Sequence, residues 1–340
     1  MRRAGPLIAA ALAASVAVPI LLGGREALWQ ALDLPAQGYL VLFGVIAVAW
    51  FTRALKVQLL LQRLGVHAGF GQVFAISLAT DFGFISTPGG VGGYAASVFY
   101  LRRAGASVNG AAAITAADQL LDWAFFALAL PVAGLSLMNA GLPDALAVLA
   151  FGTSALMIAL ALAALVARRR VADWLFGDNA FARRWPRLRH RLDQLRAFSL
   201  DMKKNAGVLL AAGPGFLGVM LALSGLQWLA RYGVLWVALL LLGHPVSFAL
   251  TLLLQSLVLH AAMWTGVPSG GGGAEIGLGA ALAAWVPATG IATALLLWRV
   301  ATMYLCLAAG AIAIAVLART SRAAAAAPLA APGTIEEPIG

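Results

Sequence analysis

Long runs of apolar residues dominate this sequence and limit its fold more than any other feature. Hydrophobic residues make up 62% of the 340 positions and charged residues only 11%, a composition that excludes a soluble globular fold. An apolar run of about twenty residues is long enough to cross a bilayer as a helix. The sequence therefore predicts an all-α polytopic membrane protein.

Two segments rich in proline and glycine interrupt these runs, one in each half of the chain. Residues 87–94 read Thr-Pro-Gly-Gly-Val-Gly-Gly-Tyr, and residues 267–275 read Val-Pro-Ser-Gly-Gly-Gly-Gly-Ala-Glu. Such residues break a helix, and non-helical backbone at membrane depth must line a protein-enclosed cavity. We expect each segment to be the tip of a re-entrant helical hairpin, and a pair of such tips is typical of a transport site. The predicted breaks are Pro88, Gly89, Gly90, Gly92, Gly93, Pro268, Gly270, Gly271, Gly272 and Gly273.

The positions of lysine and arginine orient the spans, because both are enriched in cytoplasmic loops. They place the protein in a bacterial plasma (inner) membrane with both termini in the cytoplasm, and they put residues 25–37 on the outer side. A bend is expected at Gly213-Pro214-Gly215. About six full spans are predicted over residues 6–24, 38–52, 107–131, 145–167, 207–243 and 289–318, with hairpins at about 70–100 and 247–286.

The segment at 168–204 is the longest connection and is strongly basic, with eleven Lys or Arg and four Asp. Arg183, Arg184 and Arg187 are interleaved with Trp185 and Leu188, which favours an interfacial helix on anionic lipid; a protein partner is the alternative. The net charge of +10 is concentrated between the apolar runs, so it indicates anionic lipid and no nucleic acid.

The chain is expected to form one transmembrane domain at 1–318, followed by a disordered Ala/Pro-rich tail at 319–340. Within the domain, repeat one (about 38–131) and repeat two (about 207–318) are predicted to be inverted repeats. Each repeat has a helix with a basic residue, a helical hairpin interrupted by proline and glycine, and a helix with a buried charged residue. Pro88 precedes Asp118 by about 30 residues and Pro268 precedes Arg299 by about 31, a spacing that suggests pairing of Asp118 with Arg299 near the midplane.

Five sequence segments between about 38 and 318 carry a resemblance to a known family. They are Arg53–Lys56, Pro88–Gly93, Leu101–Arg103, Pro268–Glu275 and Trp298-Arg299 with Tyr304. Together they resemble the flippase-like transmembrane domain of lysylphosphatidylglycerol synthases. That family is implied to move aminoacylated phospholipid between leaflets, and stand-alone relatives are associated with hopanoid or polyprenyl-linked lipids. The resemblance implies a stand-alone member that lacks the aminoacyl-transfer domain and does not synthesise lysyl-lipid.

Ionisable residues within the apolar runs are the candidate site residues, because burying a charge in a bilayer is costly. Glu275 would bind an ammonium-bearing headgroup or a proton, or would cap the returning helix. Arg299 would hold a lipid phosphate, or would neutralise Glu275 or Asp118. Asp118 and Asp122 share a helix face, where they would repel unless one is protonated or a cation lies between them. They form either a cation or proton site or part of a structural ion-pair network.

The other charged residues have plainer interpretations. Arg231 is either a structural partner or a headgroup ligand. Asp81 is read as a polar brace of the first hairpin, and His260 as a satisfied interior histidine. Arg53, Lys56, Arg102 and Arg103 are read as charges that set topology, with headgroup binding at the cytoplasmic mouth as the alternative.

Three functions are compatible with these features: a translocase for a phospholipid or lipid-linked headgroup, a secondary transporter of a small polar solute, and a non-transporting accessory protein of a lipid-modifying or glycosyltransferase system. An enzyme is not expected, because no nucleophile–base pair or phosphate-binding loop is present. No cofactor or metal is expected, since the four histidines and Cys306 lack ligand spacing. Membrane lipid is the expected substrate, and a second copy of the chain or a lipid-modifying enzyme is the protein partner left open.

Overall fold

The protein is described by a computed structural model that covers residues 4–176, 200–201, 204–209, 211–263 and 265–326. Within these ranges the chain is helical between short turns and has no strand, so the predicted all-α class is confirmed. The α-helices are α1 (Ala4–Leu32), α2 (Ala36–Arg63), α3 (Phe70–Ser86), α4 (Val91–Arg103), α5 (Val108–Asn139), α6 (Asp144–Phe176), α9 (Pro214–Leu241), α10 (Phe248–Met263), α11 (Gly273–Leu282), α12 (Ala288–Arg299) and α13 (Leu305–Ala326). Three shorter turns are η1 (Pro88–Gly90), η2 (Pro268–Gly270) and the π-helical η3 (Val300–Tyr304).

Six helical segments of the described chain are long and apolar enough to cross a membrane, which agrees with the number predicted. The last segment joins α12, η3 and α13 into one continuous rod. The six segments are Ala9–Leu32, Ala36–Arg63, Val108–Asn139, Asp144–Ala164, Pro214–Leu241 and Ala288–Thr320.

Several predicted boundaries were wrong. The second span does not end near residue 52, because α2 continues to Arg63 through helix-forming residues. The outer segment predicted at 25–37 is helical as far as Leu32, since α1 kinks at Gly24 (φ 68°) without ending there. The bend predicted at Gly213-Pro214-Gly215 is instead the start of α9, with Pro214 in the first turn, where a missing N–H does no harm.

Both predicted breaks interrupt pairs of short helices. Pro88 begins η1 between α3 and α4, and Pro268 begins η2 between α10 and α11. The backbone is left-handed at Gly89 (φ 59°) in the first turn and at Ser269 (φ 53°) in the second. The entry of these hairpins into the membrane from opposite sides, and the inverted repeats, stay predictions.

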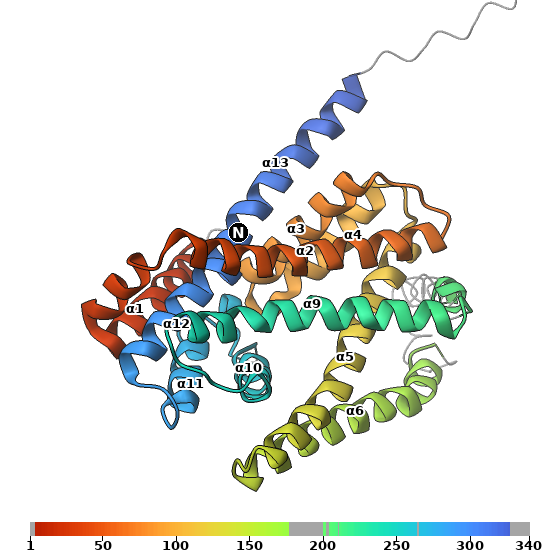
Figure 1. Ribbon diagram of the computed structural model, residues 1–340. Helices are drawn as coiled ribbons and strands as arrows, with labels where there is room; N and C mark the ends of the chain where they lie inside the picture. Colours follow the sequence, from red (N-terminus) through yellow and green to blue (C-terminus); the bar gives the residue numbers. More distant parts are fainter. Residues whose placement is uncertain (1–3, 177–199, 202–203, 210, 264, 327–340) are drawn as a thin grey trace, which may run out of the picture.

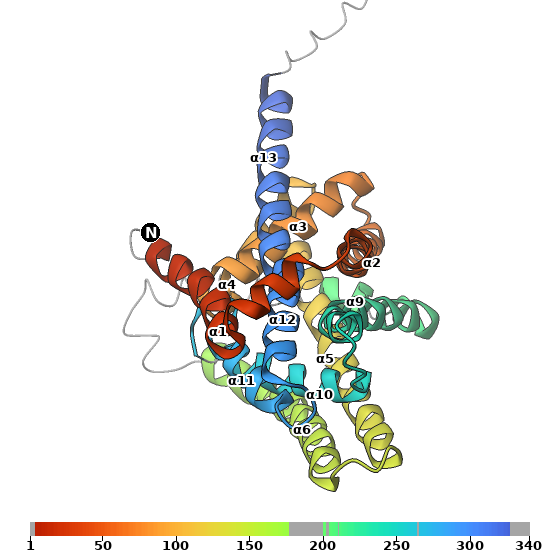
Figure 2. The same ribbon diagram turned by 60° about the vertical axis from the view of Figure 1, so that its left-hand side comes forward.

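The two breaks lie against each other in the fold, with η1 touching η2 and each touching a helix of the other hairpin. Helices α2 and α9, which carry Arg53 and Arg231, also pack together along their lengths (Figures 1 and 2). The largest apolar core lies among α2, α9, α10, α11 and α12. Helices α5 and α6 pair beside this core, and α13 rises out of it along α3. Elements from both halves of the chain therefore surround one centre.

The basic connection and the tail differ in part from expectation. Helix α6 extends to Phe176, so the first residues of the predicted loop at 168–204 are helical. Helix α13 extends to Ala326, so the tail predicted from residue 319 begins as helix. Arg183, Arg184 and Arg187, with the anionic-lipid contact predicted there, lie outside the described residues, as does the tail from 327 onward.

Candidate functional site

Ionisable side chains gather in a buried network where α2, α3, α5 and α9 meet. Its members come from both predicted repeats, and the cations alternate with the carboxylates along the chain of contacts. We call this set the central network. It consists of Arg53 and Lys56 on α2, Asp81 on α3, Asp118 and Asp122 on α5, and Arg231 on α9.

Lys56 is the most enclosed member of the central network, with a side chain that is 0% exposed. Its Nζ lies 2.6 Å from Asp118 Oδ1 and 2.8 Å from Asp122 Oδ1. It also donates a 2.8 Å hydrogen bond to Ser224 Oγ on α9. Two of the three N–H donors of the ammonium bond to Asp122 and Ser224. The contact with Asp118 Oδ1 is an ion pair, and that oxygen is buried without a hydrogen-bond partner among the described residues. Of the two alternatives left open by the sequence, a protonated aspartate or a cation between the pair, the structure has the cation, and it is Lys56.

Asp81 joins the two repeats through both of its carboxylate oxygens. Arg53 Nη1 donates to Asp81 Oδ1, and Arg231 Nη1 donates to Asp81 Oδ2 at 3.0 Å. The same Arg53 reaches Asp118 Oδ2 with Nη2 at 3.3 Å. These contacts fit the interpretation of Asp81 as a brace, and they show that the brace ties α3 to both α2 and α9.

Arg53 and Lys56, read as topology-setting charges near the cytoplasmic mouth, are instead buried inside the helical body. Arg53 is 7% exposed and Lys56 is 0% exposed, because their three-residue spacing places both on the face of α2 that meets α5. Arg102 and Arg103 are exposed at the end of α4, as such charges should be. The signal that could have identified Lys56 is the apolar sequence that continues beyond it.

A second ionic cluster lies at the break of the second hairpin. Arg299 Nε lies 2.5 Å from Glu275 Oε1, and Arg299 Nη1 contacts the Oγ and the carbonyl oxygen of Ser269 at 3.2 and 3.3 Å. Glu275 Oε2 accepts a 2.7 Å hydrogen bond from the backbone N–H of Gly272, the residue that caps α11. The arginine guanidinium also lies 4.4 Å from the centre of the Trp298 ring. Glu275 is therefore both a helix cap and an ion-pair partner.

The proposed pairing of Asp118 with Arg299 was wrong. Asp118 is paired with Arg53 and Lys56, whereas Arg299 is paired with Glu275. The near-equal spacings from the two prolines would at most give equivalent positions in the two predicted repeats, and equivalent positions need not be in contact. The reading of His260 as a satisfied interior histidine was wrong about its position, because the residue is exposed, although its Nδ1 does lie 2.6 Å from the carbonyl oxygen of Ser256.

A small polar cavity opens beside the central network. It has a volume of about 10 Å³ and is lined by Arg53, Ser77, Ser97 and Asp118 among other residues. Within the described part of the chain, Arg53 Nε and Ser77 Oγ are buried without a hydrogen-bond partner. A cavity of this volume with polar partners is large enough for one water molecule.

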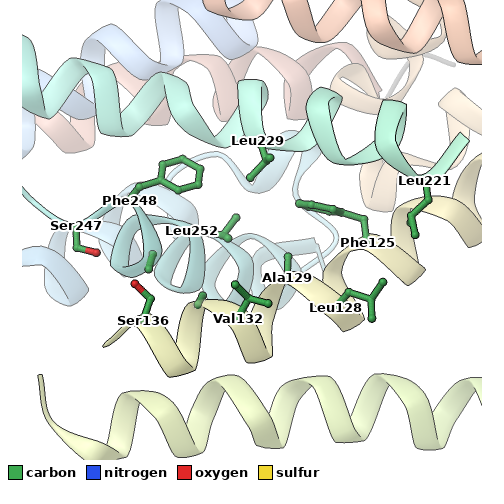
Figure 3. A pocket seen from close by; sticks show the side chains of 12 residues that line it. Phe125, Leu128, Ala129, Val132, Ser136, Leu221, Leu229, Ser247, Phe248 and Leu252 are labelled. Carbon is green, nitrogen blue, oxygen red and sulfur yellow. The ribbon is translucent and has the colours of Figure 1, made fainter. Parts of the chain in front are cut away.

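A larger, apolar groove runs between α5, α9 and α10 (Figure 3). Its volume is about 570 Å³, and apart from Ser136 and Ser247 its lining is apolar. Those two serines lie together at one end, while Phe125 and Leu221 lie toward the other. Phe125 is three residues from Asp122, and Leu221 is three residues from Ser224, the partner of Lys56. One end of the groove is therefore within one helical turn of the central network.

Comparison with known proteins shows the family of this chain. The model of the lysylphosphatidylglycerol synthase TM region matches residues 7–310. The chain belongs to this family. It is also similar to a membrane protein of Archaeoglobus fulgidus described as UPF0104, with 24% identity over 274 residues that cover 78% of this chain and 82% of that protein. The resemblance inferred from the sequence motifs is thus confirmed.

Both ionic clusters and both breaks lie inside the part that matches the lysylphosphatidylglycerol synthase TM region. This membership shows a multi-pass membrane protein of a lipid-related family. The roles of individual residues follow from the contacts described above, and these lead to a first prediction about the break in repeat one.

Substituting Gly93 with alanine is expected to destabilise the protein by about 1–3 kcal/mol. A Cβ atom at this position would lie 2.2 Å from Cγ of Phe84, whose ring fills the inside of the first hairpin. Gly71→Ala on α3 is the matched control, because its Cβ would meet no atom within 4 Å. Thermal unfolding in detergent, followed by circular dichroism, measures both variants. Equal midpoints for the two would contradict the packing described at this break.

Proposed function

We propose that this chain moves a phosphate-bearing membrane lipid, by its headgroup, between the leaflets of the bacterial inner membrane. Membership in the lysylphosphatidylglycerol synthase TM family supports a lipid-related role. In this proposal both termini are cytoplasmic, the substrate is a phospholipid or a lipid-linked headgroup, and no residue is catalytic.

The observation that carries the proposal is the junction of the apolar groove with the central network. A lipid needs an apolar surface for an acyl chain and a polar site for its headgroup. The groove supplies the first along α5 from Ser136 to Phe125, a rise of about 16 Å along the helix. Asp122 and Asp118, which lie further along α5, and their partners Arg53 and Lys56 on α2 supply the second.

Each ionic group has a chemical task in such a passage. The guanidinium of Arg53 or Arg231 and the ammonium of Lys56 are suited to a lipid phosphate. The aspartates hold these cations in place when no lipid is bound, because an unpaired charge in this setting would be strongly destabilising. Arg299 and Glu275 would act in the same way at the second break, where Ser269 holds the guanidinium.

The groove favours a lipid over a small polar solute. Its lining is apolar, and several lining residues are exposed on the outside of the helical body, including Leu128 at 59% and Val132 at 66%. The polar cavity beside Arg53 is about 10 Å³, which is too small for a solute. A transporter of polar solutes would need a wide polar cavity in place of a lateral apolar groove.

Filling the groove is expected to slow lipid movement while leaving the fold intact. Ala129 lies on the α5 side of the groove (Figure 3), and Ala129→Phe should lower the rate of headgroup translocation about tenfold, the effect of losing about 1.4 kcal/mol of chain binding. The measurement is the exposure of fluorescent phospholipid to dithionite in proteoliposomes.

The matched control is Ala124→Phe, which adds the same ring at an exposed position of α5 outside the groove lining. It should retain the rate of the unchanged protein. Equal rates for Ala129→Phe and Ala124→Phe would mean that the groove does not hold a lipid chain during transport.

A further inference from the structure

The central network is electrically balanced within its own membrane-embedded space. Three cations, Arg53, Lys56 and Arg231, face three carboxylates. All six side chains are largely buried, the most exposed being that of Arg231 at 19%. A net charge in such a place is costly, so an anion that enters must bring or find a compensating positive charge.

The three carboxylates differ in their number of cationic partners. Asp81 has two arginine partners, and Asp118 has Arg53 and Lys56. Within the described residues, Asp122 has a single cationic partner, Lys56. Asp122 is also only 6% exposed, so bulk solvent does not screen its charge. If Lys56 moves away from the aspartates, Asp122 is the carboxylate that is left without a cationic partner.

A lipid phosphate bound to Lys56 would be such an event. The Lys56 side chain is 0% exposed, and its ammonium is enclosed by Asp118, Asp122 and Ser224. The phosphate must therefore displace at least one of them. Asp118 keeps Arg53 when Lys56 turns away, whereas Asp122 keeps no cation.

We propose that Asp122 takes up one proton when the phosphate of a lipid binds Lys56, so that the chain carries a proton together with a lipid anion. This inference rests on the proposed function and adds its coupling ion. A proton supplied by hydronium or buffer of the bulk solution forms an O–H bond on the Asp122 carboxylate, and the ion pair with Lys56 breaks. One positive and one negative charge enter together, so the network stays neutral.

The structure offers an entry for this proton. The cavity of about 10 Å³ is lined by Asp118 and Ser97, and its buried Arg53 Nε and Ser77 Oγ have no hydrogen-bond partner within the described residues. A water molecule there would satisfy these atoms. Asp118 and Asp122 both contact Lys56, so the two carboxylates take up protons as a coupled pair. A proton that reaches Asp118 can therefore pass to Asp122, the carboxylate that has lost its cation.

Other ionisable groups face the same region and must be separated from Asp122 in any test. Helix α4 contributes Tyr94, α9 contributes Arg231 and Tyr232, and α10 contributes His260, whose ring lies 5.4 Å from that of Phe126. His260 is the neighbour that carries an imidazole, a side chain that commonly accepts and donates protons in proteins. His260→Gln is therefore a necessary control for any proton uptake assigned to Asp122.

The first test measures proton uptake on binding in weakly buffered detergent solution near neutral pH. The probe is dihexanoyl phosphatidylglycerol, with inorganic phosphate as a parallel arm. The unchanged protein, His260→Gln and the exposed-carboxylate control Asp144→Asn should each take up about one proton per lipid bound, because protonation and phosphate binding favour each other. Asp122→Asn should bind the lipid without proton uptake, and Asp122→Glu should retain the uptake.

Binding without uptake by the unchanged protein would overturn the proposal, as would equal uptake by Asp122→Asn. Equal uptake with inorganic phosphate would assign the site to free phosphate in place of lipid. Asp122→Asn is nearly isosteric, and its thermal midpoint shows whether it is folded. If it does not fold, Asp122→Glu decides, because loss of uptake in that folded carboxylate variant would also reject the proposal.

The second test separates this proposal from the proposed function. In proteoliposomes, translocation of fluorescent phosphatidylglycerol should respond to an imposed pH gradient and not to a potassium-diffusion potential, because the proton and the lipid anion cancel in charge. The pH of the lumen should change in step with transport. Translocation that ignores the pH gradient would reject proton coupling and leave the translocase intact, whereas the absence of translocation would reject both.

Discussion

Replacing Lys56 by methionine is expected to lower the free energy of unfolding by about 3–5 kcal/mol and to abolish lipid translocation. Methionine fills a similar volume but leaves two carboxylates, Asp118 and Asp122, around an uncharged side chain. Ser224 Oγ also loses its donor. Unfolding in detergent and the dithionite assay in proteoliposomes measure the two effects.

The control is Lys204→Met, which removes the same charge at an exposed position and should change neither quantity. Adding Asp122→Asn to Lys56→Met should restore part of the stability, because it removes the carboxylate that lost its cationic partner. Transport should not return, since the cation that binds phosphate is still missing. A Lys56→Met protein as stable as the Lys204→Met control would contradict the central network.

The second large effect is expected at Arg299, where Arg299→Met should cost about 3–5 kcal/mol and stop transport. The substitution leaves Glu275, which is 0% exposed, with the backbone N–H of Gly272 as its remaining described partner. It also frees Ser269, whose left-handed conformation is held by two contacts to the guanidinium. The second break should therefore loosen as well.

A double-mutant cycle with Glu275→Gln tests this ion pair directly. The double variant should lose less free energy of unfolding than the two single variants lose in sum, with a coupling free energy of about 0.5–3 kcal/mol. Arg319→Met, at an exposed site on α13, is the charge control. Strict additivity would show that Glu275 and Arg299 do not depend on each other.

The class of fold, the number of spans and the two breaks could be predicted because each has a local signal. Apolar runs mark spans, and proline followed by glycines marks an interrupted helix wherever it packs. The end of α2 was misplaced because Arg53 and Lys56 look like a boundary in the sequence. They are inside the helix because carboxylates from α3 and α5 neutralise them.

The partners of the charged residues could not be predicted, because they depend on how helices distant in sequence pack. Asp118 meets Lys56 because α2 and α5 contact each other, and Arg299 meets Glu275 because α11 returns against α12. The apolar groove belongs to three helices from both halves of the chain, so no segment of sequence carries a signal for it.

The most direct test of the central claim is headgroup translocation by the unchanged protein in proteoliposomes, with external dithionite as quencher and with Ala129→Phe and Lys56→Met beside it. The account predicts that the unchanged protein exposes inner-leaflet fluorescent phospholipid faster than empty liposomes do. It also predicts that the groove variant is about tenfold slower and that the Lys56 variant is inactive. Rates equal to those of empty liposomes across phosphatidylglycerol, phosphatidylethanolamine and a polyprenyl phosphate would contradict it.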